Sequence, residues 1–505
     1  MSESNGIQRV AKNTVALYTR MFFQMVVYFY TSRLVLQALG VVDYGIYDLV
    51  GGIVGILVFL NNSMTTSSLR FITYAMGQGD RKTINSVFSV SLSVHVALAI
   101  LIGVVGETIG LWYVKNCLVI PATRLSSAIW AYHCSLFAAL IAILNVPYNA
   151  TIIANERMTA FAGISIIDIL LKLFIVLLLP YIDEDSLITY ALLILIESLA
   201  IRILYATYCH IVFRQIRFHA NLLSRRKFRE MLSFAGWSML GNLSIVCNNY
   251  GINVILNLFG GPVVNAARGI AFTVQSAILS FISSFQTAVN PQITKYYAQA
   301  RLEPMNNLVL RSSKFSFFLI LFVSLPLMLE TETLLSIWLP VVPSHAVIFT
   351  RLLVCVAVVE GIANPMMVGA SATGHVRRYY ITIGTTLLST LPIAYVVLKL
   401  YGVFASVFVV QLAMAIVAQI FRLFLCRDLF CLSIREFLVN VLRPIGIVAI
   451  FASVIPVYTH FAVDNNYIRL LMVVVTSIFS IFVAVFFLGL QPMEKQFLIS
   501  KVCRR

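Results

Sequence analysis

The chain has 505 residues, of which 60% are hydrophobic and only 11% charged, and its mean hydropathy is +0.92. This composition excludes an ordinary soluble protein, because charged residues alone make up about a quarter of such chains. The formal net charge of +16 is therefore interpreted first as membrane topology, and nucleic-acid binding is not expected. The eight cysteines lie mostly inside apolar runs or beside basic loops, which excludes a disulfide framework of the secreted type.

Apolar runs of about 20 residues recur along the whole chain, and each is long enough to cross about 30 Å of hydrocarbon as a helix. They predict an all-α, polytopic membrane protein with about 14 transmembrane helices. Strands are not expected, because the alternating segments of membrane barrels are missing from the sequence. The expected spans are 13–38, 44–68, 84–106, 125–150, 159–181, 187–209, 232–258, 265–290, 312–334, 346–370, 379–400, 402–424, 441–461 and 468–490.

Basic residues gather in alternate loops on the side of the N-terminus, for example at Arg225 and Arg226. By the positive-inside rule that side is cytoplasmic, so both termini are expected in the cytoplasm. No cleavable signal peptide is expected, because the first apolar run starts after Lys12 and is too long for one. The outer turn 183–185, with the sequence Asp-Glu-Asp, has the form of a glycosyltransferase metal triplet, but in so tight a hairpin we interpret it as an acidic turn.

An internal repeat predicts two lobes of six helices. Gln78 after the second span recurs as Gln299 after the eighth, and Pro147 in the fourth span recurs as Pro365 in the tenth. These matches place helices one to six over helices seven to twelve with an offset of about 220 residues. We expect an N-terminal lobe at 1–209, a cytoplasmic linker at 210–231, a C-terminal lobe at 232–424, and helices thirteen and fourteen with a cytoplasmic tail at 425–505.

At about 100° per residue, the first, second, seventh and eighth spans each place their polar groups on one helix face. Since a charge at the bilayer centre costs about 2.5–3.5 kcal/mol, these faces predict a polar cavity between the lobes. Two alternatives stay open: Arg20, Arg70 and Arg202 could snorkel to the cytoplasmic surface, and the asparagine face of helix seven could join helices. The candidate substrate-binding residues are Arg20, Gln24, Asp48, Asn62, Arg70, Asn242, Asn249, Asn253, Arg268, Gln275 and Gln286.

Three carboxylates at depth in other spans are candidate ion-coupling groups. Asp168 and Lys172 are four residues apart in helix five, which permits a neutralising pair, whereas Glu197 in helix six and Glu360 in helix ten are isolated. Intramembrane carboxylates are typical of ion-coupling sites, and a hydrogen-bonded structural role is the alternative. No metal-ligand cluster is evident, so no cofactor is expected beyond a coupled H⁺ or Na⁺. The orientation of three further cations stays open: Arg33, Arg202 and Lys172.

Short motifs occur along almost the whole chain: Lys12-Asn13-Thr14, Ser32-Arg33-Leu34, Tyr44-Gly45-Ile46-Tyr47, Ser68-Leu69-Arg70-Phe71, Gly77-Gln78-Gly79-Asp80, Pro147-Tyr148-Asn149-Ala150, Asn364-Pro365, Arg377-Arg378 and Leu400-Tyr401-Gly402-Val403. Together they resemble the motifs of Wzx-type polysaccharide (O-antigen) flippases, in the multidrug, oligosaccharidyl-lipid and polysaccharide (MOP) exporter superfamily. The resemblance implies two six-helix lobes plus two helices, and a central cavity that opens to each side in turn. It also implies a lipid-linked oligosaccharide cargo, usually on undecaprenyl pyrophosphate, whose anionic groups meet Arg20, Arg70 and Arg268.

The resemblance implies no catalysis. It implies the flipping of repeat units from the cytoplasmic to the periplasmic leaflet of a bacterial inner membrane, by a monomer working beside a polysaccharide polymerase and chain-length machinery. Two other functions stay open. A cation-coupled multidrug exporter of the same superfamily would attract cationic drugs with carboxylates, whereas the polar faces here carry more Arg than Asp or Glu. A membrane-embedded polymerase or glycosyltransferase would need catalytic acids and a sizeable outer loop, and the outer loops here are short.

Overall fold

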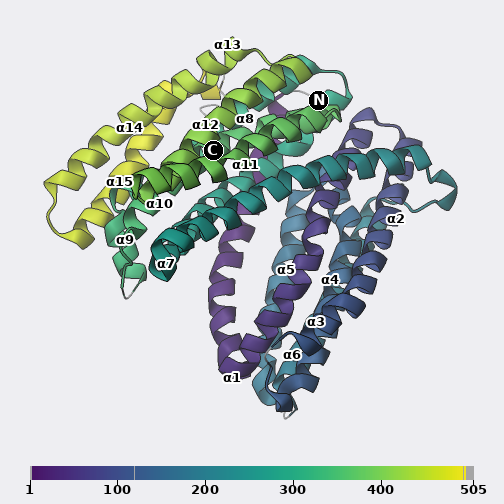
Figure 1. Ribbon diagram of the computed structural model, residues 1–505. Helices are drawn as coiled ribbons and strands as arrows, with labels where there is room; N and C mark the ends of the chain where they lie inside the picture. The colour runs from purple at the N-terminus through teal and green to yellow at the C-terminus, as the bar shows by residue number, and fades with distance from the viewer. Residues whose placement is uncertain (1–2, 119, 183, 340, 493, 496–505) are drawn as a thin grey trace. The chain divides into compact units, whose positions relative to one another are not determined.

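The computed structural model describes residues 3–118, 120–182, 184–339, 341–492 and 494–495, and within these ranges it contains helices and no strand (Figure 1). The predicted all-α class is confirmed. Twelve helices in the described ranges are long and apolar enough to cross a membrane, and they match the predicted spans from 84–106 onward one for one. The two earlier predicted spans, 13–38 and 44–68, lie in the long helix α1, Glu3–Gln78, which is not among the twelve.

Two long helices each contain one sharp break at a glycine. α1 breaks at Gly40 (φ 74°, ψ 169°), and α7, Arg225–Ala298, breaks at Gly261 (φ 68°, ψ −164°). Residues with a side chain rarely adopt this combination of angles, so only glycine turns the chain here without strain. Each pair of spans is therefore joined by a kink and not by a loop.

The left-handed residues repeat at the offset seen in the sequence. Gly40 and Gly261 are about 220 residues apart, and so are Gly79, at the end of α1, and Ala300, at the end of α7. The sequence repeat is thus accompanied by a repeat of backbone geometry.

The chain divides into two compact units, one of which is Arg9–Met239. In this N-terminal unit α4 packs against both α2 and α6, and α5 packs against α6. Aromatic and branched side chains such as Tyr132 and Leu136 fill its core. After α1, its helices are α2 Arg81–Val105, η1 Gly106–Gly110, α3 Leu111–Asn116, η2 Ala122–Arg124, α4 Leu125–Ala154, α5 Met158–Leu178, η3 Leu179–Tyr181, α6 Ser186–Val212 and η4 Ala220–Leu222.

The C-terminal unit contains the chain from Leu240 onward together with the first residues. α10 packs against α8 and α12, and α11 packs against α12. These contacts repeat those of α4 with α2 and α6, and of α5 with α6, in the N-terminal unit. α14 and α15 form a hairpin that packs on α8 (Figure 1). After α7, its helices are α8 Leu302–Leu329, α9 Thr331–Trp338, α10 Ala346–Thr373, α11 Arg377–Tyr401, α12 Ala405–Phe430, α13 Ile434–Phe437, η5 Leu438–Leu442, α14 Arg443–Ala462, α15 Asn466–Ala484 and η6 Val485–Gly489.

Two carboxylates, Glu330 and Glu494, connect α8 to the α14–α15 hairpin and the residues after it. Glu330, directly after α8, accepts hydrogen bonds from His460 Nδ1 of α14 (2.7 Å) and Arg469 Nε of α15 (2.9 Å). Near the middle of α8, the buried Lys314 Nζ lies 2.8 Å from Glu494 Oε2, beyond η6. The hairpin and the residues that follow it are therefore attached to α8 by ion pairs at two points.

Part of the predicted acidic turn has a structural role in the N-terminal unit. Asp185 caps the start of α6 by accepting hydrogen bonds from the backbone N–H groups of Leu187 and Ile188. Arg124 Nη1 donates to Asp185 at 2.7 Å and also pairs with Asp43 of α1. Residue 183 of the predicted triplet lies outside the described residues. Asp185 therefore joins the start of α6 to Arg124 of η2, which in turn pairs with α1.

Candidate substrate and coupling sites

Arg20 lies on α1 and rests against α5. Its guanidinium carbon is 4.8 Å from the centroid of the Phe161 ring, and its buried Nε has no hydrogen-bond partner. Among the described residues no carboxylate pairs with it. An aromatic face attracts a guanidinium without neutralising it, so Arg20 is held in place with its charge intact.

The other predicted residues of α1 differ in their surroundings. The Arg70 guanidinium lies near three aromatic rings, 4.5 Å from Phe71, 5.0 Å from Tyr74 and 5.7 Å from Phe234. Three candidate polar side chains on α1 are exposed: Gln24, Asp48 and Asn62. They thus stay outside the packed interior of the N-terminal unit, where a ligand can reach them.

Arg268 occupies a similar position in the C-terminal unit. It follows the Gly261 break, is 8% exposed, and donates from Nη2 to the backbone oxygen of Asn249, 2.7 Å away, on the segment before the break. Its guanidinium carbon is also 5.5 Å from the Phe272 ring, while Nε has no partner. This arginine, too, pairs with no carboxylate in the described residues.

The remaining candidates on α7 have two kinds of surroundings. Asn242, Asn249 and Asn253 are half-buried, whereas Gln275 and Gln286 are buried. Gln286 Nε2 donates to Gly361 O of α10 (2.8 Å) and to Ser316 Oγ of α8 (3.2 Å), so this amide joins three helices. The substrate-binding role of these residues stays a prediction.

The N-terminal unit brings three charged residues together. Asp168 and Lys172 of α5 form the ion pair that their spacing permits, with Oδ1 and Nζ 2.6 Å apart. The buried Glu197 of α6 lies beside both, and its Oε1 has no hydrogen-bond partner. Tyr205, two turns further along α6 than Glu197, lies near Asp168 and near Arg20. Two predicted coupling carboxylates thus lie together, and Tyr205 lies between them and one predicted substrate-binding cation.

Glu360, the third predicted coupling residue, lies on α10 in the C-terminal unit. It is half-buried and interacts electrostatically with Arg422 of α12, whose Nε has no hydrogen-bond partner. Sequence reasoning did not select Arg422, although it is a charge inside the predicted span 402–424. That position alone was the signal that could have found it.

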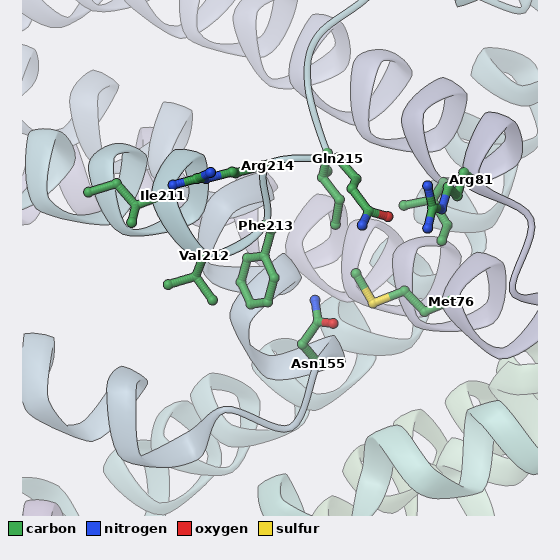
Figure 2. A pocket seen from close by; sticks show the side chains of 10 residues that line it. Met76, Arg81, Asn155, Ile211, Val212, Phe213, Arg214 and Gln215 are labelled. Carbon is green, nitrogen blue, oxygen red and sulfur yellow. The ribbon is translucent and has the colours of Figure 1, made fainter.

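The structure also contains a cavity that the sequence did not predict. It has a volume of about 500 Å³, lies within the N-terminal unit, and is lined by none of the candidate residues. Figure 2 shows Arg214, Phe213 and Gln215, beyond α6, near Arg81 at the start of α2 and Asn155 at the end of α4. The lining residues are Met76, Arg81, Ile84, Asn155, Ile211, Val212, Phe213, Arg214, Gln215 and Ile216.

Metal ligands do not gather anywhere in the described ranges: no three His, Cys, Asp or Glu side chains lie close enough to hold an ion.

Residues 8–297 match the family described as "Polysaccharide biosynthesis protein". The match covers more than half of the sequence. The chain belongs to this family. The family resemblance inferred from the motifs is thereby confirmed, and a comparison with curated proteins finds no match.

The fold is similar to that of solved MATE-type transporters. A variant of a Vibrio cholerae MATE transporter superposes with a TM-score of 0.72 at 16% identity, covering 84% of this chain and 97% of the other. An outward-facing multidrug resistance MATE transporter of the MOP superfamily gives 0.70 at 16% identity, with coverages of 85% and 99%. A MOP superfamily transporter from Pyrococcus furiosus gives 0.69 at 16% identity, with coverages of 85% and 98%. The chain is thus a multi-pass membrane protein with this fold, and family and fold support a transporter and not an enzyme.

Proposed function

We propose that the protein flips undecaprenyl-pyrophosphate-linked oligosaccharide repeat units from the cytoplasmic to the periplasmic leaflet, for a cell-surface polysaccharide such as O-antigen. The polar faces of both units would line the path of the headgroup and open to each side in turn. A pyrophosphate cannot cross hydrocarbon unaided, because burying unpaired charge is very unfavourable. Polar side chains replace water around the headgroup while the polyprenyl tail stays in lipid.

The observation that supports this most is the state of Arg20 and Arg268, one in each unit. Arg20 lies over the Phe161 ring, and Arg268 donates to the backbone oxygen of Asn249. No carboxylate in the described ranges pairs with either arginine. A buried charge without a counter-ion is costly, so an anionic ligand offsets the cost. The planar fork of a guanidinium matches phosphate oxygens.

The test is the lipid pool of cells that lack the protein and are complemented with variants. We expect undecaprenyl-linked repeat units to accumulate on the cytoplasmic leaflet, with wild type restoring export and R20A or R268A reducing it at least about tenfold, since each removes a charge-assisted contact. R225Q serves as the matched control, because Arg225 is an exposed arginine at the start of α7.

Two results would contradict the proposal. Repeat units that already lie outside in the deletion strain indicate a polymerase. Normal polysaccharide with loss of dye or drug efflux indicates a cation-coupled multidrug exporter.

We further propose that Asp168, Glu197 and Glu360 couple transport to H⁺ or Na⁺. Support comes from Glu197, which is buried next to the Asp168–Lys172 pair and has an unpartnered oxygen. A proton or sodium ion at this oxygen would change the charge of the Asp168–Lys172–Glu197 cluster, and Tyr205 lies between this cluster and Arg20. Occupancy of the ion site would then change how strongly Arg20 attracts an anionic headgroup.

We place the protein in a bacterial inner membrane with both termini cytoplasmic, because the basic loops alternate with short outer loops. It would act as a monomer that hands its cargo to the polysaccharide polymerase and chain-length machinery.

A further inference from the structure

The cavity in the N-terminal unit is lined by apolar, amide and cationic side chains. Six of its lining residues are apolar, among them Met76, Phe213 and Ile216, and two are arginines, Arg81 and Arg214. Asn155 completes the amide lining with Gln215, and no acidic residue lines the cavity. It lies among loops that the positive-inside rule places on the cytoplasmic side. A cationic rim beside an apolar wall suits an amphiphile with an anionic headgroup.

The two arginines keep their charge for a ligand. In the described ranges neither the Arg81 nor the Arg214 side chain forms an ion pair or hydrogen bond, and both are exposed at the mouth of the cavity. In the view of Figure 2 Arg81 and Arg214 lie on opposite sides of the cavity, and the Arg214 side chain points toward Ile211. Two exposed arginine side chains at the rim of one cavity are long enough to turn toward the oxygens of one phosphate-bearing headgroup while its first carbons meet the apolar lining.

The lining residues 213–216 continue into a segment, 217–222, that is fixed to the rest of the unit. Three hydrogen bonds join this segment to α2: Arg217 N to Asn85 Oδ1 (3.1 Å), His219 N to Ser89 Oγ (2.9 Å), and Ser86 Oγ to Leu222 O (2.8 Å). The cavity is therefore preformed, which spares a ligand the cost of ordering the loop. Its volume also falls within the range of small-ligand sites, about 300–1,000 Å³.

We propose that this cavity binds the phosphate-bearing headgroup of a membrane amphiphile, with Arg81 and Arg214 on the phosphate and the apolar wall against the first carbons of its chain. Two sources share this chemistry: an anionic phospholipid of the same leaflet, and a polyprenyl phosphate or pyrophosphate. In the second case the cavity is a loading site ahead of the path proposed above. Headgroup binding itself does not depend on that proposed function.

Binding is tested by native mass spectrometry of the full chain in neutral detergent. The probes, titrated separately, are dioleoyl-phosphatidylglycerol, undecaprenyl phosphate, zwitterionic dioleoyl-phosphatidylcholine and inorganic phosphate. R81Q/R214Q is compared with R217Q/R225Q, which removes the same charge from two exposed arginines of the neighbouring chain that do not line the cavity. R81K/R214K keeps the charge but loses the guanidinium fork.

We expect an anionic amphiphile to bind wild type and R217Q/R225Q equally, and R81Q/R214Q about tenfold more weakly, with R81K/R214K in between. Loss for both lipids indicates general anionic-headgroup binding, and loss for undecaprenyl phosphate alone indicates the loading site. Equal binding by R81Q/R214Q and wild type would overturn the proposal, and so would inorganic phosphate binding as tightly as the lipids.

If the R81Q/R214Q variant unfolds at a lower temperature than wild type, R81Q and R214Q are measured singly against R217Q with the same criteria. This assay measures binding and not transport, so a negative result here does not contradict the flippase proposal. A negative result in the lipid-pool experiment likewise does not contradict headgroup binding in the cavity.

Discussion

Glu330 lies at the junction of α8 and α9 with its side chain fully buried. Burial alone would raise the pKa of this carboxyl, but hydrogen bonds donated by His460, Thr333 and Arg469 lower it and outweigh the burial. The net pKa of Glu330 therefore lies below its usual value. A carboxylate with three donors is stabilising only while it stays charged.

The sign of this shift predicts acid sensitivity. The folded pKa lies below the unfolded value of about 4.3, so the contribution of Glu330 to stability is complete above that pH and is lost as the pH falls through the folded pKa. E330Q should lower the free energy of unfolding by about 3 kcal/mol at neutral pH, because it leaves Arg469 without its counter-charge. Melting temperatures should show the gap between wild type and E330Q narrowing below about pH 4.

The control is E332Q, which changes an exposed acid two residues away and should match wild type at every pH. A gap between wild type and E330Q that is the same at acid and neutral pH would show that Glu330 does not act through its charge.

This residue also shows what the sequence does not contain. The predicted span 312–334 includes Glu330, so hydropathy indicated that the chain here is helical and near a membrane face. Its partners His460 and Arg469 follow it by 130 and 139 residues and lie on two other helices. The periodicity of one helix does not predict contacts with other helices.

At the scale of the helices, Gly40 and Gly261 determine how two pairs of spans are joined. Both glycines adopt angles that other residues avoid, yet a Cβ added at either would meet no atom within 4 Å. A substitution at these positions therefore changes backbone strain and not packing.

We expect G40A and G261A each to lower the free energy of unfolding by about 2 kcal/mol, because alanine must hold an unfavourable backbone conformation. G45A is the matched control: a Cβ there also has open space, and Gly45 is helical, so alanine should be neutral or stabilising by about 0.5–1 kcal/mol. Thermal unfolding in detergent measures all three. If G40A and G261A are as stable as G45A, the breaks do not require glycine.

The positions of the helices could be predicted from the sequence, and their ends and junctions only in part. Long apolar runs predicted the twelve spans because the bilayer thickness sets helix length. The gap left between 13–38 and 44–68 contains Gly40, but hydropathy does not distinguish a loop from a kink within one continuous helix. Likewise the polar face of α7 was predictable, whereas the contact of Gln286 with α8 and α10 was not, because periodicity identifies a face but not its neighbour.

Coupled transport is a property of the whole molecule, because the proposed ion-binding carboxylates and the proposed headgroup cations occur in both units. In proteoliposomes carrying undecaprenyl-linked repeat units, wild type should flip faster under an imposed H⁺ or Na⁺ gradient than without one. E197Q and E360Q cannot change charge on ion binding, so each should reduce that acceleration at least about tenfold while headgroup binding persists.

The comparison variant is E303Q, which changes an exposed glutamate at the start of α8 and should keep the response to the gradient. If both E197Q and E360Q respond like wild type, ion coupling does not pass through these groups.

The pair between Lys314 and Glu494 has a consequence for biosynthesis. Glu494 is translated after all twelve membrane-spanning helices of the described ranges, so α8 is inserted with a buried amine whose partner carboxylate is made later. A variant cut after Gly489 would keep these twelve helices but leave Lys314 without Glu494 in its interior. The ion pair thus depends on residues that follow the described spans.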